Sequence, residues 1–284
     1  MKRSNKFIRK FISTRYNIPG YQDQSVIEAL LNAQHVLENA SDLSVESLVR
    51  LLPRQFILKT NVIDWPEGSI LLRSRLMGVT DWREAGYWGR SEFWEAPAKS
   101  VNSFGRLNEP GESVFYLAND PTQTFKEIRY QHGRNQHESV VLSSFIVKRE
   151  FQSTVIGAHD KSVSVANIYS NMIHILFSYP SEIYGNNVYK LSNYLSNFYN
   201  YVPGSPQVFA YPPVGNSDPA IMNVAFVPED AHQYLNYSGS VVIPSYQDSI
   251  DGKITVAFAN DENFNVVDPS SNLKWIKNNF MISF

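Results

Sequence analysis

The chain contains no cysteine among its 284 residues. Disulfide bonds, thiol catalysis and thiolate metal sites are therefore excluded. No window approaches the roughly 20 consecutive apolar residues that a membrane-spanning helix needs. We therefore expect no membrane partner, and the missing cysteine fits a reducing, cytoplasmic compartment.

Neither sign of charge is in large excess, because 25 Lys and Arg stand against 27 Asp and Glu, a formal net charge of −2. Such a balance does not favour nucleic acid as a partner. A local exception is the stretch from Met1 to Gly20, which has several Lys and Arg and no acidic residue. We interpret it as a solvated or partly helical arm, with contact to nucleic acid or an anionic surface as the alternative.

Two common ligand-binding patterns are also missing. The sequence has neither the glycine-rich phosphate loop of nucleotide hydrolases nor a dinucleotide fingerprint that opens a helix after a strand. His132 and His137 lie close together in a polar segment, but they lack a third convergent ligand. We interpret that segment as a polar loop and expect no metal site.

The N-terminal part of the chain predicts helices. Apolar residues from Val26 to Leu37 recur at three- and four-residue spacing after Asp23, and Leu48, Leu51 and Leu52 do so after Ser44. A helical hairpin follows, which we interpret as a buttress for the rest of the chain rather than a partner-binding pair. The expected division is residues 1–55, a basic arm and helical hairpin, and residues 56–284, a second and larger domain.

The stretch from Phe104 to Arg129 combines a turn, a strand and a helix. Asn108 to Gly111 is a turn pattern, and Ser113 to Ala118 predicts a short strand. Asp120-Pro121 predicts a helix start, so Thr122 to Arg129 is expected to be helical. Glu127 then lies about two turns into the helix, over the end of the strand and facing whatever Arg106 and Tyr116 face. This arrangement predicts a small-molecule site.

A second predicted strand runs from Ser69 to Met77 and carries two arginines. Because side chains alternate along a strand, Arg73 and Arg75 point to the same face. Burying both is costly unless an anion pairs with them, whether a ligand or an internal carboxylate. The following segment, Thr80 to Ser103, is rich in aromatic residues and predicts a long loop that covers a site.

Farther along the chain the pattern alternates again between strand and helix. Strands are expected around Val140 to Lys148, Val241 to Pro244 and Ile254 to Ala259, with a hairpin turn at Asp251-Gly252, and a helix is expected from Tyr184 to Tyr199.

Several short motifs, taken together and in their order along the chain, resemble the RES domain, a family named after an arginine, a glutamate and a serine. The likeness runs from about Ile57 to Tyr246, and it implies that residues 56–284 form an NAD-binding catalytic domain of the α+β class. The motifs that carry it are Arg73-Ser-Arg75, Gly105-Arg106-Leu-Asn108-Glu-Pro-Gly111, Tyr116-Leu-Ala118, Asp120-Pro121, Glu127, Ala210-Tyr-Pro-Pro-Val214 and Asn223-Val-Ala-Phe226.

The resemblance implies an ADP-ribosyltransferase-like fold, a mixed α+β core of two packed sheets that form an NAD cleft, with surrounding helices. Known members are bacterial toxins held in check by an antitoxin protein, and they consume NAD by phosphorolysis or hydrolysis or transfer ADP-ribose to a protein. It therefore implies NAD as the substrate, inorganic phosphate as one candidate nucleophile, an antitoxin partner and no metal.

The resemblance also assigns roles to individual residues. Glu127 would be the catalytic carboxylate, and Arg73 would also be a catalytic residue. Arg73 and Arg106 would hold the pyrophosphate, with Arg75 as the rival for the first arginine. Tyr116 would line the nicotinamide or ribose pocket, and Asn108 belongs to the same cofactor-binding set.

The expected chemistry explains these residue types. Cleavage between ribose and nicotinamide passes through an oxocarbenium-like state that a carboxylate stabilises, while arginines neutralise the diphosphate. The sequence departs from the family pattern at one position, because Pro213 stands where the family has a serine. Two alternatives therefore stay open, namely protein ADP-ribosylation and a degenerate RES fold that binds a nucleotide or partner without turnover.

Overall fold

The computed structural model describes residues 24–40, 44–50, 61–77, 92–129, 139–157, 164–178, 187–200, 207–214, 218–243, 255–259 and 264–267. The chain divides into two compact units, each made of separate chain segments. The helical unit comprises the chain up to residue 63 with residues 102–110 and 154–217, and the β-rich unit comprises residues 64–101, 111–153 and 218 onward. The expected division into residues 1–55 and 56–284 stays a prediction.

Several predictions fall on segments outside the described residues. They are the basic N-terminal arm, the histidine-containing loop with His132 and His137, and the hairpin turn at Asp251-Gly252. Of the predicted long loop, residues 92–103 are described and include a short 3-10 helix, η3 (Ala98–Ser100).

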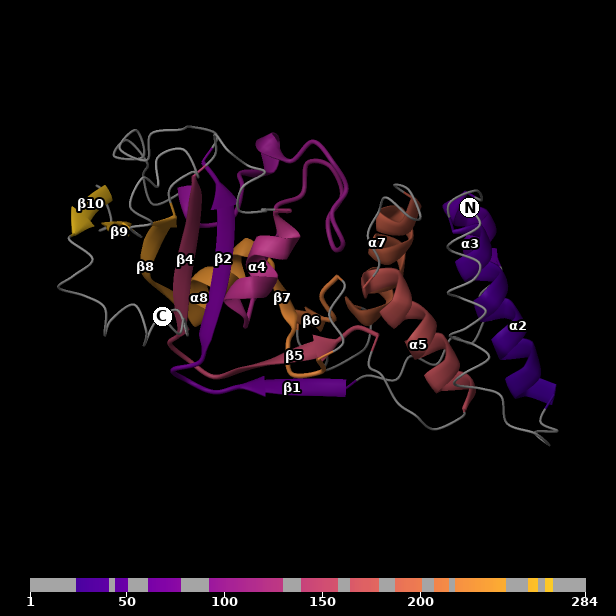
Figure 1. The fold of residues 1–284 in the computed structure, drawn as a ribbon. Coiled ribbons are helices and arrows are strands. Elements are labelled where there is room, and N and C mark those ends of the chain that lie inside the picture. Colours follow the sequence, from indigo (N-terminus) through magenta and orange to yellow (C-terminus); the bar gives the residue numbers. More distant parts are fainter. Residues whose placement is uncertain are drawn as a thin grey trace. The chain divides into compact units, whose positions relative to one another are not determined.

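In the helical unit, α2 (Gln24–Asn39) packs on α5 (Val165–Ser178), and α3 (Val45–Arg50) and α5 both pack on α7 (Asn187–Asn200) (Figure 1). The helices predicted around Val26 to Leu37 and around Leu48 are thereby confirmed, as is the one predicted from Tyr184. Helix α5 is buried on nearly every side, so it forms the centre of this unit.

The strands of the β-rich unit follow the order β7-β3-β2-β4-β8-β9-β10, and each pair of neighbours in this order is antiparallel. Their bounds are β2 (Ile70–Leu76), β3 (Phe115–Ala118), β4 (Val140–Val147), β7 (Asn223–Phe226), β8 (Leu235–Ile243), β9 (Thr255–Ala259) and β10 (Phe264–Val267). The predicted strands at residues 69–77, 113–118 and 140–148 are confirmed. The described strands of this unit form one sheet, where the RES resemblance implied two packed sheets.

Two further strands contain residues of both units, β1 (Asn61–Trp65) and β5 (Phe151–Val155). Within the helical unit, the end of β5 pairs in parallel with β6 (Phe209–Tyr211), so the chain combines parallel and antiparallel pairing. With helices beside these strands, the architecture confirms the predicted α+β class. None of the helices in the described ranges is long and apolar enough to cross a membrane.

The register of the β-rich sheet separates its side chains into two faces. Leu72 pairs with Ala118, and Ala118 with Asn223, so these residues share one face with Ser74 and Tyr116. Helix α4 (Pro121–Glu127) covers that face, because the Ser74 hydroxyl lies 2.6 Å from the Thr124 hydroxyl of α4. We call it the α4 face.

The opposite face of the sheet carries an aromatic cluster, and we call it the aromatic face. Phe115 of β3 and Phe145 of β4 meet there edge to face, with ring centroids 5.0 Å apart. Trp94 stacks on Phe115 and also on His232 of α8 (Pro228–Tyr234). The segment around Trp94 and helix α8 therefore cover this side of the sheet.

Candidate functional site

Helix α4 begins as its sequence predicts. The Asp120 side chain accepts a hydrogen bond from the backbone N–H of Gln123 at 2.8 Å, and Pro121 occupies the first helical turn. Upstream, Gly111 has φ +86°, which is the conformation that the predicted turn needs glycine to adopt. Local sequence therefore fixes where the helix starts, whereas its end was predicted too late, because α4 stops at Glu127 and not at Arg129.

Glu127 is held by two neutral amides. Its Oε1 accepts from Nε2 of Gln123 at 2.9 Å, one turn earlier on α4, and from Nδ2 of Asn223 on β7 at 2.7 Å. The residue is exposed, and among the described residues its Oε2 has no hydrogen-bond partner. One carboxylate oxygen is therefore fixed in place while the other faces outward, free to bind a ligand.

The two amides that hold Glu127 each keep an unused acceptor. Oε1 of Gln123 and Oδ1 of Asn223 are buried and have no hydrogen-bond partner among the described residues. Such buried carbonyl oxygens are uncommon and costly. Tyr116 lies on the same α4 face, half-buried on β3. The structure thus brings together two of the predicted site residues, Tyr116 and Glu127, on one face of the sheet.

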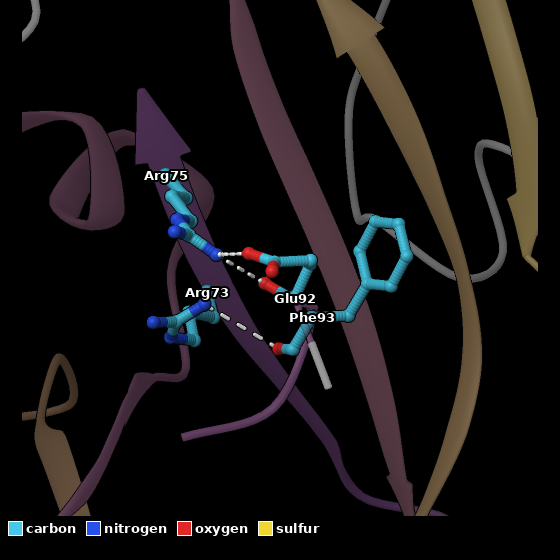
Figure 2. A network of polar contacts seen from close by, with 4 residues as sticks. All are labelled: Arg73, Arg75, Glu92 and Phe93. Carbon is cyan, nitrogen blue, oxygen red and sulfur yellow. Dashed lines mark hydrogen bonds and ion pairs between the residues drawn. The ribbon is translucent and has the colours of Figure 1, made fainter. Parts of the chain in front are cut away.

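Arg73 and Arg75 lie on the other face. Both project from β2 toward the segment that contains Glu92 and Phe93 (Figure 2). Nη1 of Arg75 donates to the Glu92 carboxylate, with which it forms an ion pair, and to the Glu92 carbonyl oxygen at 2.9 Å. The prediction that the two arginines share a face is therefore confirmed, but the structure places them on the face opposite α4 and Glu127.

Arg73 sits against the aromatic cluster. Its guanidinium carbon lies 5.9 Å from the ring centroid of Phe115, and its Nη1 donates to the carbonyl oxygen of Phe93 at 3.4 Å, a long hydrogen bond. Burial, together with the charge of Arg75, lowers the pKa of Arg73 to about 10, and the charges of Glu95 and Glu92 oppose that shift. No described carboxylate forms an ion pair with Arg73.

The segment beside these arginines is pinned to helix α8. Oε1 of Glu95 lies 3.1 Å from Nε2 of His232, whose ring stacks on Trp94 with centroids 4.2 Å apart. The other carboxylate oxygen of Glu95 is buried and has no hydrogen-bond partner among the described residues. Packing of Trp94 and the Glu95–His232 contact together hold residues 92–95 over the aromatic face.

Arg106 and Asn108 belong to the helical unit, where they contact the unit's own backbone. Nη1 of Arg106 donates to the carbonyl oxygen of Leu176 in the last turn of α5 at 2.8 Å, and its guanidinium carbon lies 4.8 Å from the Tyr189 ring centroid. A cation at the C-terminal end of a helix is electrostatically favourable. These contacts give Arg106 a structural role in joining α5 to α7, and its role in binding a cofactor stays a prediction.

The loop around Asn108 is held in the same way. Nδ2 of Asn193 on α7 donates to the carbonyl oxygens of Gly105 at 2.7 Å and Asn108 at 3.0 Å, while Ser192 donates to that of Arg106. The Asn108 amide in turn donates to the carbonyl oxygen of Glu109 at 3.1 Å. Asn108 therefore shapes the loop, and its predicted place in the cofactor-binding set also stays a prediction.

Pro213 is buried in the helical unit just after β6. A pocket of about 500 Å³ lies along β4 and β8 near Glu67, Lys148 and Tyr237, and none of the predicted site residues lines it. Among the residues that the structure describes, no group of three or more His, Asp or Glu could hold a metal ion.

Sequence reasoning missed the two residues that fix Glu127. Gln123 could have been found, because a residue four positions earlier on a helix lies beside Glu127. Asn223 is separated from Glu127 by 96 positions, so only the folded sheet brings them together. No protein-family model, curated protein or solved structure matches the chain, so its resemblance to the RES domain rests on the motifs in its sequence.

Proposed function

We propose that the protein cleaves the bond between nicotinamide and ribose in NAD, with Glu127 as the catalytic carboxylate. The observation that carries the proposal is the fixed and exposed Glu127 side chain, which two neutral amides hold through one oxygen. Neutral donors orient a carboxylate without pairing it with a cation, so its negative charge stays available for a positive transition state.

The chemistry fits this arrangement. As the glycosidic bond breaks, positive charge develops on the ribose ring, and a carboxylate beside the anomeric carbon stabilises it. Nicotinamide leaves as a neutral base, so no general acid is required. Oε2 of Glu127 can accept from a ribose hydroxyl. Tyr116 on the same face supplies an aromatic wall.

The proposal also includes the fold, the partner and the nucleophile that the RES resemblance implies. The fold is ADP-ribosyltransferase-like, an antitoxin protein blocks the site in a cytoplasmic setting, and water or inorganic phosphate is the nucleophile. Because Arg73 and Arg75 lie on the opposite face from Glu127, the proposal assigns the reaction to Glu127 and Tyr116 and does not require either arginine at the reacting bond.

A second candidate function is nucleotide or partner binding without turnover. Three observations favour it. Arg73 and Arg75 lie on the face of the sheet opposite Glu127, Pro213 stands at the family's serine position, and Arg106 contacts backbone and Tyr189 within its own unit. Transfer of ADP-ribose to a protein is the enzymatic alternative. The three functions differ in what happens to NAD.

The test is to incubate the purified full chain with NAD, with and without inorganic phosphate, and to measure nicotinamide release and label transferred to protein. Release without protein labelling supports the proposal, and a phosphate requirement identifies phosphorolysis. Label on protein would support ADP-ribosylation instead. Binding of NAD without its loss would support the non-enzymatic function, and no loss and no binding would contradict both.

A matched pair of variants tests the role of Glu127. Glu127→Gln keeps an acceptor for both amides and removes the charge, so nicotinamide release should fall by about 100-fold or more. Glu150→Gln makes the same change at an exposed glutamate between β4 and β5 in the same unit, and release should not change. Equal activity of the two variants would remove Glu127 from the reaction.

A further inference from the structure

The pocket of about 500 Å³ lies at one end of the β-rich sheet, where β2, β4 and β8 are neighbours (Figure 1). It is lined by the turn before β2, by the end of β4 with the residue that follows it, and by residues 236–238 of β8. Its volume is in the range of sites that bind small molecules. Neither Glu127 nor the arginines of β2 line it, so what it binds does not depend on the proposed NAD cleavage.

The turn before β2 forms one side of this pocket. Residues 66–69 are closed by a hydrogen bond of 3.1 Å from the last N–H to the first carbonyl oxygen. Gly68, the third residue, has φ +86°, which a type II turn requires at that position. The N–H of Gly68 donates to the carbonyl oxygen of Val147 at 2.8 Å, which holds the turn against the end of β4. The second residue, Glu67, therefore has a fixed backbone position beside the pocket that it lines.

A β-bulge in β8 forms another side of the pocket. Ser144 and Phe145 are consecutive on β4, but they pair with Gly239 and Tyr237 on β8, so Ser238 is the extra residue of the bulge. A bulge bends its strand and redirects the side chains beside it, which is why bulges are common next to binding sites. Both Tyr237 and Ser238 line the pocket, and both are half-buried.

Two charged side chains of opposite sign line the pocket, and both are exposed. Glu67 forms no hydrogen bond or ion pair with a described residue. Lys148 uses one N–H, which its Nζ donates to the carbonyl oxygen of His232 near the end of α8 at 2.9 Å. Because an ammonium group has three N–H donors, two of them stay available to a ligand. A ligand that pairs with both side chains must carry a positive and a negative group.

The same pocket also has an apolar part. Ile146 of β4 and Asn236 of β8 both line it, and they pair across the two strands, so their side chains lie next to each other on one face of the sheet. Ile146 is half-buried, so part of its hydrocarbon surface stays open to a ligand. The Asn236 side chain is exposed and has no hydrogen bond to a described residue, so its amide can donate or accept.

A small zwitterion with a hydrocarbon part satisfies all of these groups at once. We propose that the pocket binds a free α-amino acid with an apolar side chain. Glu67 accepts from the ammonium group of the ligand, Lys148 donates to its carboxylate, and Ile146 contacts its side chain. A ligand that has only one of the two charges leaves Glu67 or Lys148 without a partner and binds less tightly. Both of these side chains are exposed, and exposed ion pairs are weak, so we expect modest affinity.

Ligand-observed NMR titration of the full chain at pH about 7 with leucine, N-acetyl-leucine, leucinamide and glycine tests the proposal. Leucine carries both charges, N-acetyl-leucine carries only the carboxylate, leucinamide carries only the ammonium group, and glycine lacks the apolar side chain. Leucine should bind about fivefold more tightly than each of the other three, the difference expected from one weak ion pair or one partly buried apolar contact. Equal binding of leucine and any of the three, or no binding of leucine, would overturn the proposal.

Two variants assign the two charges separately. Glu67→Gln removes the partner of the ammonium group, so leucine should bind about fivefold more weakly and no better than N-acetyl-leucine. Lys148→Met removes the partner of the carboxylate, so leucine should bind no better than leucinamide. Lys148 also holds α8 through the His232 carbonyl, but loss of that contact alone would weaken every ligand and leave their order unchanged. An equal loss for all ligands in either variant would therefore contradict the proposed role of that residue.

Further variants separate this pocket from surface charge and from NAD cleavage. Asn236→Trp fills the pocket from an exposed position, so leucine binding should be lost. Glu150→Gln and Arg149→Met remove exposed charges close in sequence that do not line the pocket, and leucine binding should not change. Glu127→Gln should bind leucine normally while it loses nicotinamide release. If Glu150→Gln weakened leucine binding as much as Glu67→Gln, the binding would be general electrostatic attraction and the proposal would be wrong.

Discussion

The two faces of the β-rich sheet use their polar groups in different ways. On the α4 face, two neutral amides hold the Glu127 carboxylate at the surface. On the aromatic face, Arg73 lies against Phe115 and shares its surroundings with Arg75 and Glu92 (Figure 2). The resemblance to the RES domain assigned the two arginines and Glu127 to one site. The alternation of side chains along β2 instead places the arginines on one face of the sheet, while α4 and Glu127 lie on the other.

The central serine of that motif shows how the separation arises. Ser74 points away from its two arginine neighbours and bonds to Thr124, which fixes α4 on its own side. A strand residue can face either the helix or the arginines, but not both. The Glu127 carboxylate and the two guanidinium groups therefore lie on opposite faces of the sheet.

Among the variants considered, loss of Trp94, which covers the aromatic face, should have the largest effect on stability. Trp94 is 3% exposed and packs against Phe115, Phe145 and His232. Trp94→Ala should destabilise the protein by about 3–5 kcal/mol, measured by denaturant unfolding, because it leaves a large cavity. Nicotinamide release per folded molecule should stay close to that of the unmodified protein, and a loss above about 1.4 kcal/mol in transition-state stabilisation would show that the faces are coupled.

A smaller effect is expected at the amide that positions Glu127. Asn223→Ala removes the 2.7 Å hydrogen bond to Oε1 and should lower kcat for NAD cleavage by about tenfold, with a smaller change in KM. Asn119→Ala is the matched control, because it deletes an amide that bonds to the backbone of Ala220 and Met222 instead. If Asn119→Ala lowered kcat as much, the effect of Asn223→Ala would be structural and not one of positioning.

The smallest effect should be a gain in stability on replacing Arg73. Burial lowers the pKa of Arg73 to about 10, below its usual value, so the charged form is disfavoured by folding. This cost is fully present below pH 10 and is relieved only as the pH rises above the folded pKa. Arg73→Met should therefore stabilise the protein by about 1 kcal/mol at neutral pH.

Thermal or denaturant unfolding of the variant and the unmodified protein measures that gain. Loss of stability in Arg73→Met would instead make Arg73 a structural residue of the aromatic face.

Much of the local structure could be predicted because local rules determine it. Alternation predicted β2, and the Asp120-Pro121 pair predicted where α4 begins. Helix α8 was missed although its start, Pro228 followed by Glu229 and Asp230, is a recognisable pattern. Helix α5 was missed although Asn167, Ser170, Asn171 and His174 recur at helical spacing, a pattern that indicates a helix with one polar face.

The candidate site was harder to predict because its parts depend on tertiary contacts. The period of two showed that Arg73 and Arg75 share a face, but only the packing of Thr124 on Ser74 shows which face α4 covers. The contact between Asn223 and Glu127 depends on the pairing of β3 with β7. Arg106 shows the same limit, since the carbonyl group that it binds comes from a helix 70 positions later.

The most direct test of the account is nicotinamide release from NAD by Arg73→Met, compared with Glu127→Gln under the same conditions. If the two faces have separate roles, Arg73→Met keeps the rate of the unmodified protein, while Glu127→Gln loses about 100-fold or more. A loss in Arg73→Met as large as that in Glu127→Gln would contradict the account, because it would place the arginine and the glutamate in one catalytic site.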